Sequence, residues 1–206
     1  PNAVSAIRWS ANTLGSNYTV TKVAGTLTVT PRPVTLTAAN ISKPYDGTPL
    51  ELTAADIAAD GIVAGESFVY SNFASRTEAG QTPATFDYAP GAGTSLANYA
   101  VTVTPGRTVT ITKSATAISV TAASESWTYD GEAHSNRTWM ATNLDTLQTG
   151  DALEVTFDEA SVVTTPQDGA NGDGIVPNVI TGVRVIRSGA EDVTANYTVE
   201  WFPGTL

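Results

Sequence analysis

Several short stretches of this chain alternate between apolar and polar side chains. Residues 34–38 alternate valine, leucine and alanine with threonines, and residues 117–122 follow the same pattern. An alternation with a period of two predicts half-buried β-strands, because successive side chains of a strand point to opposite faces. We therefore expect strands at both places.

Other short segments also have strand character. Residues 66–71, 84–88 and 150–155 are expected to be strands, with Gly80 and Pro83 separating the first two. Residues 53–60 differ, because Thr53 is followed three residues later by an acid, the spacing of a helix capping box. One or two helical turns are expected there.

A longer pattern recurs along the chain. Residues 16–31 read as two strands, 18–23 and 26–30, joined by Ala24 and Gly25 and closed by Pro31. Residues 98–112 form a second version of this pattern, and residues 196–206 form a third that stops as its last strand begins. Self-similarity at a long period predicts an array of repeated structural units.

The recurrences divide the chain into three parts. Residues 1–31 are expected to be the C-terminal half of a preceding repeat, residues 32–113 a complete repeat, and residues 114–206 a second repeat truncated in its last strand. The junctions are short, so neighbouring repeats are expected to be semi-rigidly coupled. For residues 1–31 we consider two arrangements: a hairpin packed on the first complete repeat, and strand exchange with another molecule.

Each complete repeat contains a Tyr-Asp-Gly sequence, which we interpret as a structural turn. Glycine supplies a positive φ angle and aspartate bonds to its own downstream backbone. No second carboxylate or histidine recurs beside these turns, so the pattern gives no support to acid–base catalysis. The turn residues are Tyr45, Asp46, Gly47, Tyr129, Asp130 and Gly131.

Composition and charge exclude several classes of partner and chemistry. The 206 residues carry a formal net charge of −10 without a basic stripe, which argues against nucleic acid and membrane-surface partners. There are no cysteines, so disulfides and thiolate chemistry are excluded. No apolar run reaches the length of a membrane span, about 18 residues. The single histidine, His134, is expected at the surface, and we expect neither an enzyme nor a cofactor.

Three features are weak candidates for ligand chemistry. Asp168, Asn171 and Asp173 lie among glycines, as in a calcium loop, although their spacing does not match the usual alternation of ligands. Trp139 is a candidate exposed aromatic residue for binding a glycan or a protein. Lys43 and Asn98 have the residue types of an isopeptide crosslink, but tryptophan replaces the lysine in the second repeat.

Most other large aromatic side chains are expected to pack in the cores of the strands. These are Trp9, Trp127, Trp201, Tyr18, Tyr99 and Tyr197.

The Tyr-Asp-Gly turn and the recurrent Asn-Tyr segment with its Gly-Thr-Leu-Thr-Val-Thr-Pro strand together resemble the MBG and YDG repeats of bacterial surface proteins. The resemblance covers nearly the whole chain. It implies an all-β fold of tandem Ig-like β-sandwich repeats, with β-grasp-like mixed sheets as the alternative.

The resemblance also implies a role outside the cell, on a bacterial surface protein that is anchored to the cell wall or secreted. The function we expect is a non-catalytic stalk repeat of an adhesin, whose partners are the neighbouring repeats of the same chain. Two alternatives remain: a module that binds a host glycan or protein, and an accessory module of a secreted carbohydrate-active enzyme.

Overall fold

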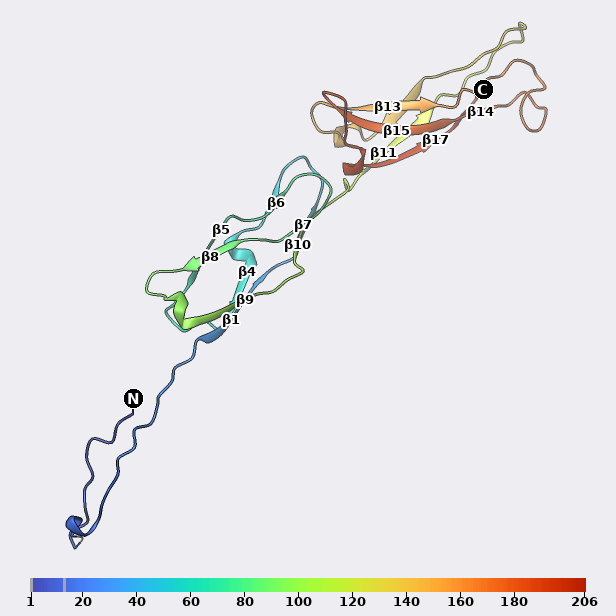
Figure 1. Ribbon diagram of the computed structural model, residues 1–206. Coiled ribbons are helices and arrows are strands. Elements are labelled where there is room, and N and C mark those ends of the chain that lie inside the picture. Colours follow the sequence, from blue (N-terminus) through green and yellow to red (C-terminus); the bar gives the residue numbers. More distant parts are fainter. Residues whose placement is uncertain (1, 13) are drawn as a thin grey trace.

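The computed structural model describes residues 2–12 and 14–206. Figure 1 shows an elongated molecule with an extended N-terminal segment followed by two groups of strands, one beyond the other. We call residues 32–113, which contain β1 to β10, the first body, and residues 114–206, which contain β11 to β18, the second body. No helix within the described residues has the length and apolar character needed to cross a membrane.

Strands dominate the described residues, so the all-β class is confirmed. The helical elements are single 3-10 turns of three residues each. They are η1 (Gly15–Asn17), η2 (Ala54–Asp56), η3 (Leu96–Asn98), η4 (Leu144–Thr146) and η5 (Thr194–Asn196).

The first sheet of the first body has β1 at its centre. It has the order β4 (Ile57–Asp60), β1 (Arg32–Ala38) and β9 (Tyr99–Val103). Strand β1 pairs antiparallel with β4 and parallel with β9. Val34, Leu36 and Ala38 are buried, which confirms the alternating strand predicted there.

The second sheet of the first body has β10 at its centre. It has the order β2 (Ile41–Pro44), β10 (Thr108–Thr112) and β7 (Gly80–Pro83). Strand β10 runs parallel to β2 and antiparallel to β7. Two antiparallel pairs complete this body: β3 (Leu50–Glu51) with β6 (Ser75–Arg76), and β5 (Phe68–Ser71) with β8 (Asp87–Pro90).

The first sheet of the second body has β11 at its centre. It contains β12 (Trp139–Thr142), β11 (Ala117–Ala122) and β17 (Thr198–Phe202). Strand β11 pairs antiparallel with β12 and parallel with β17. The buried residues of β11 are Ile118, Val120 and Ala122, again as the alternation predicted.

Two further sheets complete the second body. One has the order β13 (Asp151–Phe157), β15 (Ile180–Arg187) and β16 (Glu191–Asp192). The other pairs β14 (Pro177–Asn178) with β18 (Gly204–Thr205). The strand expected at residues 150–155 is therefore confirmed as part of β13.

Two local predictions in the first body need correction. The strand expected at residues 84–88 lies mostly between β7 and β8, and the expected separators Gly80 and Pro83 are the two ends of β7. Proline is tolerated there because Pro83 ends β7, which is an edge strand of its sheet. The capping box at Thr53 and Asp56 is confirmed, but it closes one 3-10 turn and the chain then enters β4. This turn is shorter than the helix on which the β-grasp alternative depended.

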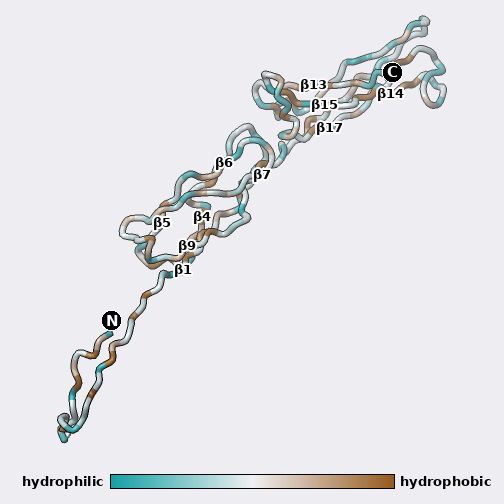
Figure 2. The backbone as a smooth tube through the Cα atoms, in the orientation of Figure 1, coloured by the Kyte–Doolittle hydropathy of each residue, from teal (hydrophilic) through white to brown (hydrophobic). Residues whose placement is uncertain are grey.

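Two predictions for the N-terminal segment, its strands and its packing on the first body, are wrong in this structure. The strands expected at residues 18–23 and 26–30 do not form, and among the described residues of the segment one isolated bridge joins Asn2 and Gly25. The segment runs away from the first body instead of packing on it, and apolar positions lie along its length (Figure 2). A two-stranded hairpin is marginal in water unless a third strand or another layer covers its apolar face.

The aromatic side chains expected in a core are buried in some places and exposed in others. Tyr99 and Tyr197 are buried as expected, and Trp127 is partly buried. Trp9, Tyr18 and Trp201 are exposed, which contradicts the expectation that they lie in a core. The first two lie in the N-terminal segment and stack on each other, with ring centroids 5.7 Å apart.

Candidate functional site

The first Tyr-Asp-Gly turn lies at the end of β2, facing the second body. A carboxylate oxygen of Asp46 accepts hydrogen bonds from Lys43 Nζ at 2.7 Å and from the backbone N–H of Thr48 at 2.9 Å. These bonds hold the pKa of Asp46 well below its usual value. Gly47 has a φ of +76°, which glycine adopts without steric cost. The interpretation of this sequence as a structural turn agrees with the geometry.

The second Tyr-Asp-Gly turn is built in the same way. Asp130 accepts a hydrogen bond from the backbone N–H of Glu132 at 2.9 Å and lies 3.0 Å from Nε2 of His134. The backbone bond, followed by the histidine, lowers the pKa of Asp130. His134 is half-buried and stacks on Trp127, with ring centroids 5.0 Å apart.

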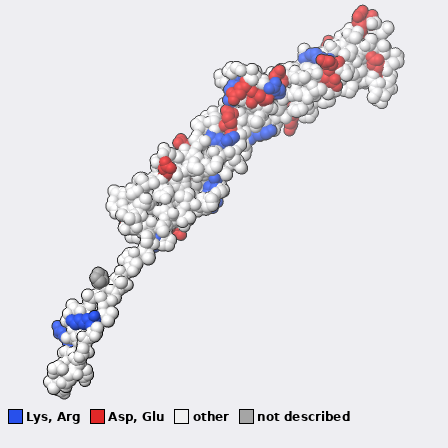
Figure 3. All heavy atoms as spheres, viewed as in Figure 1, with Lys and Arg blue, Asp and Glu red and all other residues white. Residues whose placement is uncertain are grey.

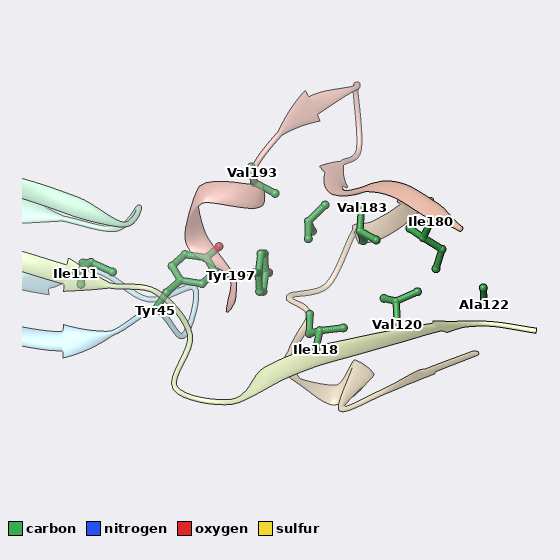
Figure 4. Packing of buried hydrophobic residues seen from close by; sticks show 10 residues of the cluster. Tyr45, Ile111, Ile118, Val120, Ala122, Ile180, Val183, Val193 and Tyr197 are labelled. Atoms are coloured by element: carbon green, nitrogen blue, oxygen red, sulfur yellow. The ribbon is translucent and has the colours of Figure 1, made fainter. Parts of the chain in front are cut away.

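The tyrosines of the two turns differ in their surroundings. Tyr45 is 5% exposed, whereas Tyr129 is 64% exposed. Tyr45 belongs to a buried apolar cluster whose other members, apart from Ile111, come from the second body. Figure 4 shows Tyr45 and Ile111 approaching this cluster from the first body.

The centre of the contact is a pair of tyrosines. The rings of Tyr45 and Tyr197 meet edge to face, with centroids 5.3 Å apart and an interplanar angle of 80°. Such aromatic pairs contribute roughly 0.5–1.5 kcal/mol beyond the area they bury. The two bodies thus share one continuous core instead of touching only through a linker. We call this contact the junction.

Charged groups surround the tyrosine pair. Arg187 donates hydrogen bonds to Glu78 at 2.9 Å and to Asp151 at 3.1 Å, and from Nη2 to the hydroxyl oxygen of Tyr45 at 2.8 Å. These carboxylates raise the pKa of Arg187 still further, and burial together with Glu78 raises the pKa of Tyr45. Figure 3 shows acidic and basic atoms intermixed where the bodies meet.

Asn196 connects the backbones of the two bodies. Its side-chain oxygen accepts a hydrogen bond from the backbone N–H of Ala79 at 2.7 Å, its amide nitrogen donates to Glu78, and its backbone carbonyl accepts from Ser114 at 2.8 Å. Asn196 and Ser114 are both buried. A buried polar group that lacked its partner would cost about 1–3 kcal/mol, so these bonds fix the orientation of the junction.

A second feature lies at the far end of the second body. A cleft of about 220 Å³ is lined by residues 126–129, 163–166 and 173–174. His134 and Leu206 also line it. We call it the end cleft. The backbones of His134 and Val163, two residues that line the cleft, exchange two hydrogen bonds, at 2.8 and 3.0 Å.

The residues suggested as calcium ligands have other partners. Asp168 accepts hydrogen bonds from the backbone and hydroxyl of Thr165 at 2.8 and 2.9 Å, and Asp173 accepts one from the backbone of Ile175 at 3.1 Å. No cluster of three or more His, Cys, Asp or Glu suited to a metal ion occurs among the described residues. The calcium hypothesis therefore gains no support from this loop.

The other suggested ligand residues are also engaged. Trp139, the weak candidate for an exposed aromatic residue, is partly buried against the core of the second body. Trp139 pairs with the buried Ala122 of β11, so both side chains face the same side of the sheet. Lys43 bonds to Asp46 in the turn, while Asn98 ends η3 ahead of a strand in the other sheet.

No family model matches this chain, and neither a curated protein nor a solved structure matches it. The recurrent motifs contain the tyrosines of the junction, but they contain neither Arg187 nor Glu78. Both are single charged residues without a local pattern. They lie 109 positions apart, so only tertiary structure brings them together.

Proposed function

We propose that the two bodies are consecutive Ig-like repeats of one module and that the chain is a stiff spacer in the stalk of a bacterial surface adhesin. In this role the chain carries load and holds a distal binding region away from the cell, and no reacting group is needed. The resemblance of the recurrent motifs to MBG and YDG repeats motivates the cellular setting.

Equivalent hydrogen bonds in the two bodies support a common module. In the second body, the hydroxyl of Tyr197 donates to Asp151 at 2.7 Å and accepts from the backbone N–H of Gln148 at 3.0 Å. In the first body, the hydroxyl of Tyr99 donates to Glu66 and accepts from the backbone N–H of Val63 at 3.2 Å.

The sheets built around the first strand of each body support the same interpretation. In both, the central strand pairs antiparallel with a strand that comes after the Tyr-Asp-Gly turn, β4 or β12, and parallel with a strand that begins at the recurrent tyrosine or one residue after it. The central strands are β1 and β11, and the parallel partners are β9 and β17.

The observation that carries the spacer proposal is the shared core of the junction. Interfaces between flexibly linked domains are usually small and polar, and relative motion is then the default. Here a tyrosine pair is enclosed by the ionic bonds of Arg187 and by the buried bonds of Asn196. Such a junction resists bending, as a spacer requires.

The absence of cysteine from the sequence makes a direct test possible. Val69→Cys and Met140→Cys introduce one spin label in each body, at side chains that are 55% and 73% exposed. Pulsed dipolar spectroscopy should give one narrow distribution of label distances, which broadens when Tyr45→Ala is added. A broad distribution in the chain with an intact junction would refute stiffness.

The cellular setting has its own test. An antibody raised against this chain should label intact cells of the organism that produces it, or the surrounding medium. Labelling that required lysis of the cells would contradict a stalk, whatever the distance measurement showed.

A further inference from the structure

Two long runs of the first body lie side by side. Residues 32–44 contain β1 and then β2, and residues 99–112 contain β9 and then β10. We call them the entry run and the exit run, because the chain enters the first body through one and leaves it toward the second body through the other. Figure 1 shows β1 and β9 at the end beside the N-terminal segment and β10 nearer the second body.

The two runs pair with each other in parallel in both sheets of the first body. Residues 32–36 of β1 pair with residues 99–103 of β9, and residues 41–44 of β2 pair with residues 109–112 of β10. The register shifts by only one residue from the first sheet to the second. The same two runs are therefore partners over nearly their whole length.

Further hydrogen bonds join the runs where they pass from one sheet to the next. The backbone N–H of Thr104 donates to the carbonyl of Leu36 at 2.8 Å, and the hydroxyls of Thr37 and Thr104 lie 2.7 Å apart. The side-chain oxygen of Asn40 accepts a hydrogen bond from the backbone N–H of Thr108 at 3.0 Å. The connection between the runs is thus continuous from one sheet to the other.

Each run also contributes the central strand of one sheet. Strand β1 of the entry run lies between β4 and β9, and strand β10 of the exit run lies between β2 and β7. The residues between the runs, 45–98, form the strands β3 to β8. Removal of either run from the body would therefore break hydrogen bonds on both sides of its central strand.

We propose that the first body is a mechanical clamp, in which tension along the chain passes directly from the entry run to the exit run and bypasses residues 45–98. The proposal rests on the stalk function proposed above, since tension is a load that a stalk carries.

The parallel pairing determines how the bonds respond to tension. Pulling on the entry run at Arg32 and on the exit run at Thr112 slides the runs along each other, because both runs point toward the second body. All bonds between them are then strained together. One hydrogen bond contributes only about 0.5–1.5 kcal/mol net, so resistance depends on many bonds sharing the load. Strands that are pulled apart from one end break their bonds in succession instead.

The second body receives the load in a similar way. The exit run leads through residues 113–116 to β11, which is the central strand of its sheet and pairs in parallel with β17. Within this connection, the buried Ser114 donates its backbone N–H to the carbonyl of Asn196 at 2.8 Å. Tension that leaves the clamp thus enters another central strand.

Single-molecule force spectroscopy on the whole chain tests the clamp, since a chain without cysteine accepts handles at chosen positions. Thr30→Cys with Ala115→Cys places the handles at exposed residues just outside the two runs. Thr30→Cys with Asp60→Cys places them at one end of the antiparallel pair of β1 and β4, where Asp60 lies opposite Thr35.

The unfolding force should be several-fold higher with the handles at 30 and 115. In the other geometry β4, an edge strand, is peeled from Asp60 onward and its bonds break in succession. Forced unfolding is governed by the unfolding rate, which depends on the direction of pulling, and not by the free energy of unfolding. The two double variants should therefore be equally stable in urea. Equal unfolding forces in the two geometries would overturn the clamp.

A pair of single substitutions separates the load path from general stability. With the handles at 30 and 115, Asn40→Ala should lower the unfolding force, because it removes the bond to Thr108 that joins the runs. Asp87→Ala is the matched control, since Asp87 accepts a hydrogen bond from Asn72 at 2.6 Å outside both runs, and it should leave the force unchanged.

An equal loss of force in Asn40→Ala and Asp87→Ala would show that the load does not follow the two runs, and the proposal would be wrong. These forces are measured within the first body, whereas the label distances report on the junction. The stiff spacer and the clamp can therefore fail separately.

Discussion

Arg187 in the second body donates a hydrogen bond from Nη2 to the hydroxyl oxygen of Tyr45 in the first body, at 2.8 Å. The two residues are 142 positions apart in the sequence. Their bond joins the ionic part of the junction to its aromatic part, because the same guanidinium also binds Glu78 and Asp151. The junction should therefore respond to substitutions as one unit.

Removal of the guanidinium should destabilise the chain. Arg187→Ala leaves the fully buried side chain of Asp151 without its cation, and a broken buried ion pair costs about 3–5 kcal/mol. The cost here should lie near the lower figure, because the Arg187 side chain is 28% exposed and Tyr197 still donates to Asp151. Urea unfolding followed by circular dichroism measures the change.

Arg184 offers the matched control for Arg187. It lies on the same strand and pairs with Asp192 at 3.0 Å, but its side chain is 52% exposed. Exposed pairs contribute about 0–1 kcal/mol. If Arg184→Ala and Arg187→Ala proved equally damaging, the special role of the junction would be wrong.

The two turn tyrosines form a second matched pair. Tyr45→Ala removes a buried ring from the shared core and should cost about 3–5 kcal/mol, as such truncations do. Tyr129→Ala should change the stability of the chain by no more than about 0.5 kcal/mol, because its ring is exposed. The free energies of urea unfolding of the two variants, each compared with that of the unaltered chain, measure both effects.

A glycine pair tests close packing beside the end cleft. A Cβ on Gly204 would lie 2.3 Å from the carbonyl oxygen of Ala123, a backbone atom that cannot rotate away. Gly204→Ala should cost about 1–3 kcal/mol through overpacking. Gly182→Ala should be neutral or slightly stabilising, because a Cβ there has no neighbour within 4 Å. Equal thermal midpoints for the two variants would contradict the close packing of β18 against the backbone of Ala123.

Alkaline pH should loosen the junction. Burial, followed by the bond to Asp151, raises the pKa of Tyr197 above its usual value near 10, and burial also raises that of Tyr45. The folded state then retains protons that the unfolded state loses. The stabilising contribution is complete below pH 10 and decreases as the pH rises toward the folded pKa values.

Unfolding at a series of pH values, with tyrosinate absorbance recorded in parallel, measures this loss. The free energy of unfolding should fall with pH above about 10, and it should fall less steeply in Tyr197→Phe. A stability that stayed level through this range would show that the two hydroxyls ionise as easily in the folded state as in the unfolded one.

Individual strands could be predicted from the sequence, because the alternation of apolar and polar residues is a property of neighbouring positions in the chain. The alternation in β1 and β11 predicts strands whatever surrounds them, since it reflects the geometry of the strand itself. The same reasoning failed for residues 18–23 and 26–30. Their alternation is as clear, but no neighbouring strand lies beside them in this structure. A pattern of period two identifies the apolar face of a strand, but it does not identify the element that packs against that face.

The recurrent tyrosines show how far the candidate site was predictable. Their repetition marked Tyr45 and Tyr197 as structurally important, and the geometry places both at the junction. Their mutual contact was not predictable, because Tyr45 comes from a turn in the first body and Tyr197 lies between η5 and β17 in the second. For Trp139 the sequence was less informative. Its local sequence is irregular, and neither its place in β12 nor its packing against the core was predicted from it.

By itself, the sequence determined the all-β class, the main strands, the turn chemistry of the Tyr-Asp-Gly segments and the recurrence of motifs. These depend on residues close together in the chain, where backbone sterics and side-chain periodicity act directly. The tertiary structure alone decided that Arg187, Glu78 and Tyr45 meet, that Tyr129 is exposed, and that a cleft opens beside Leu206. Contacts of this kind depend on how separate sheets are brought together, which no local pattern encodes.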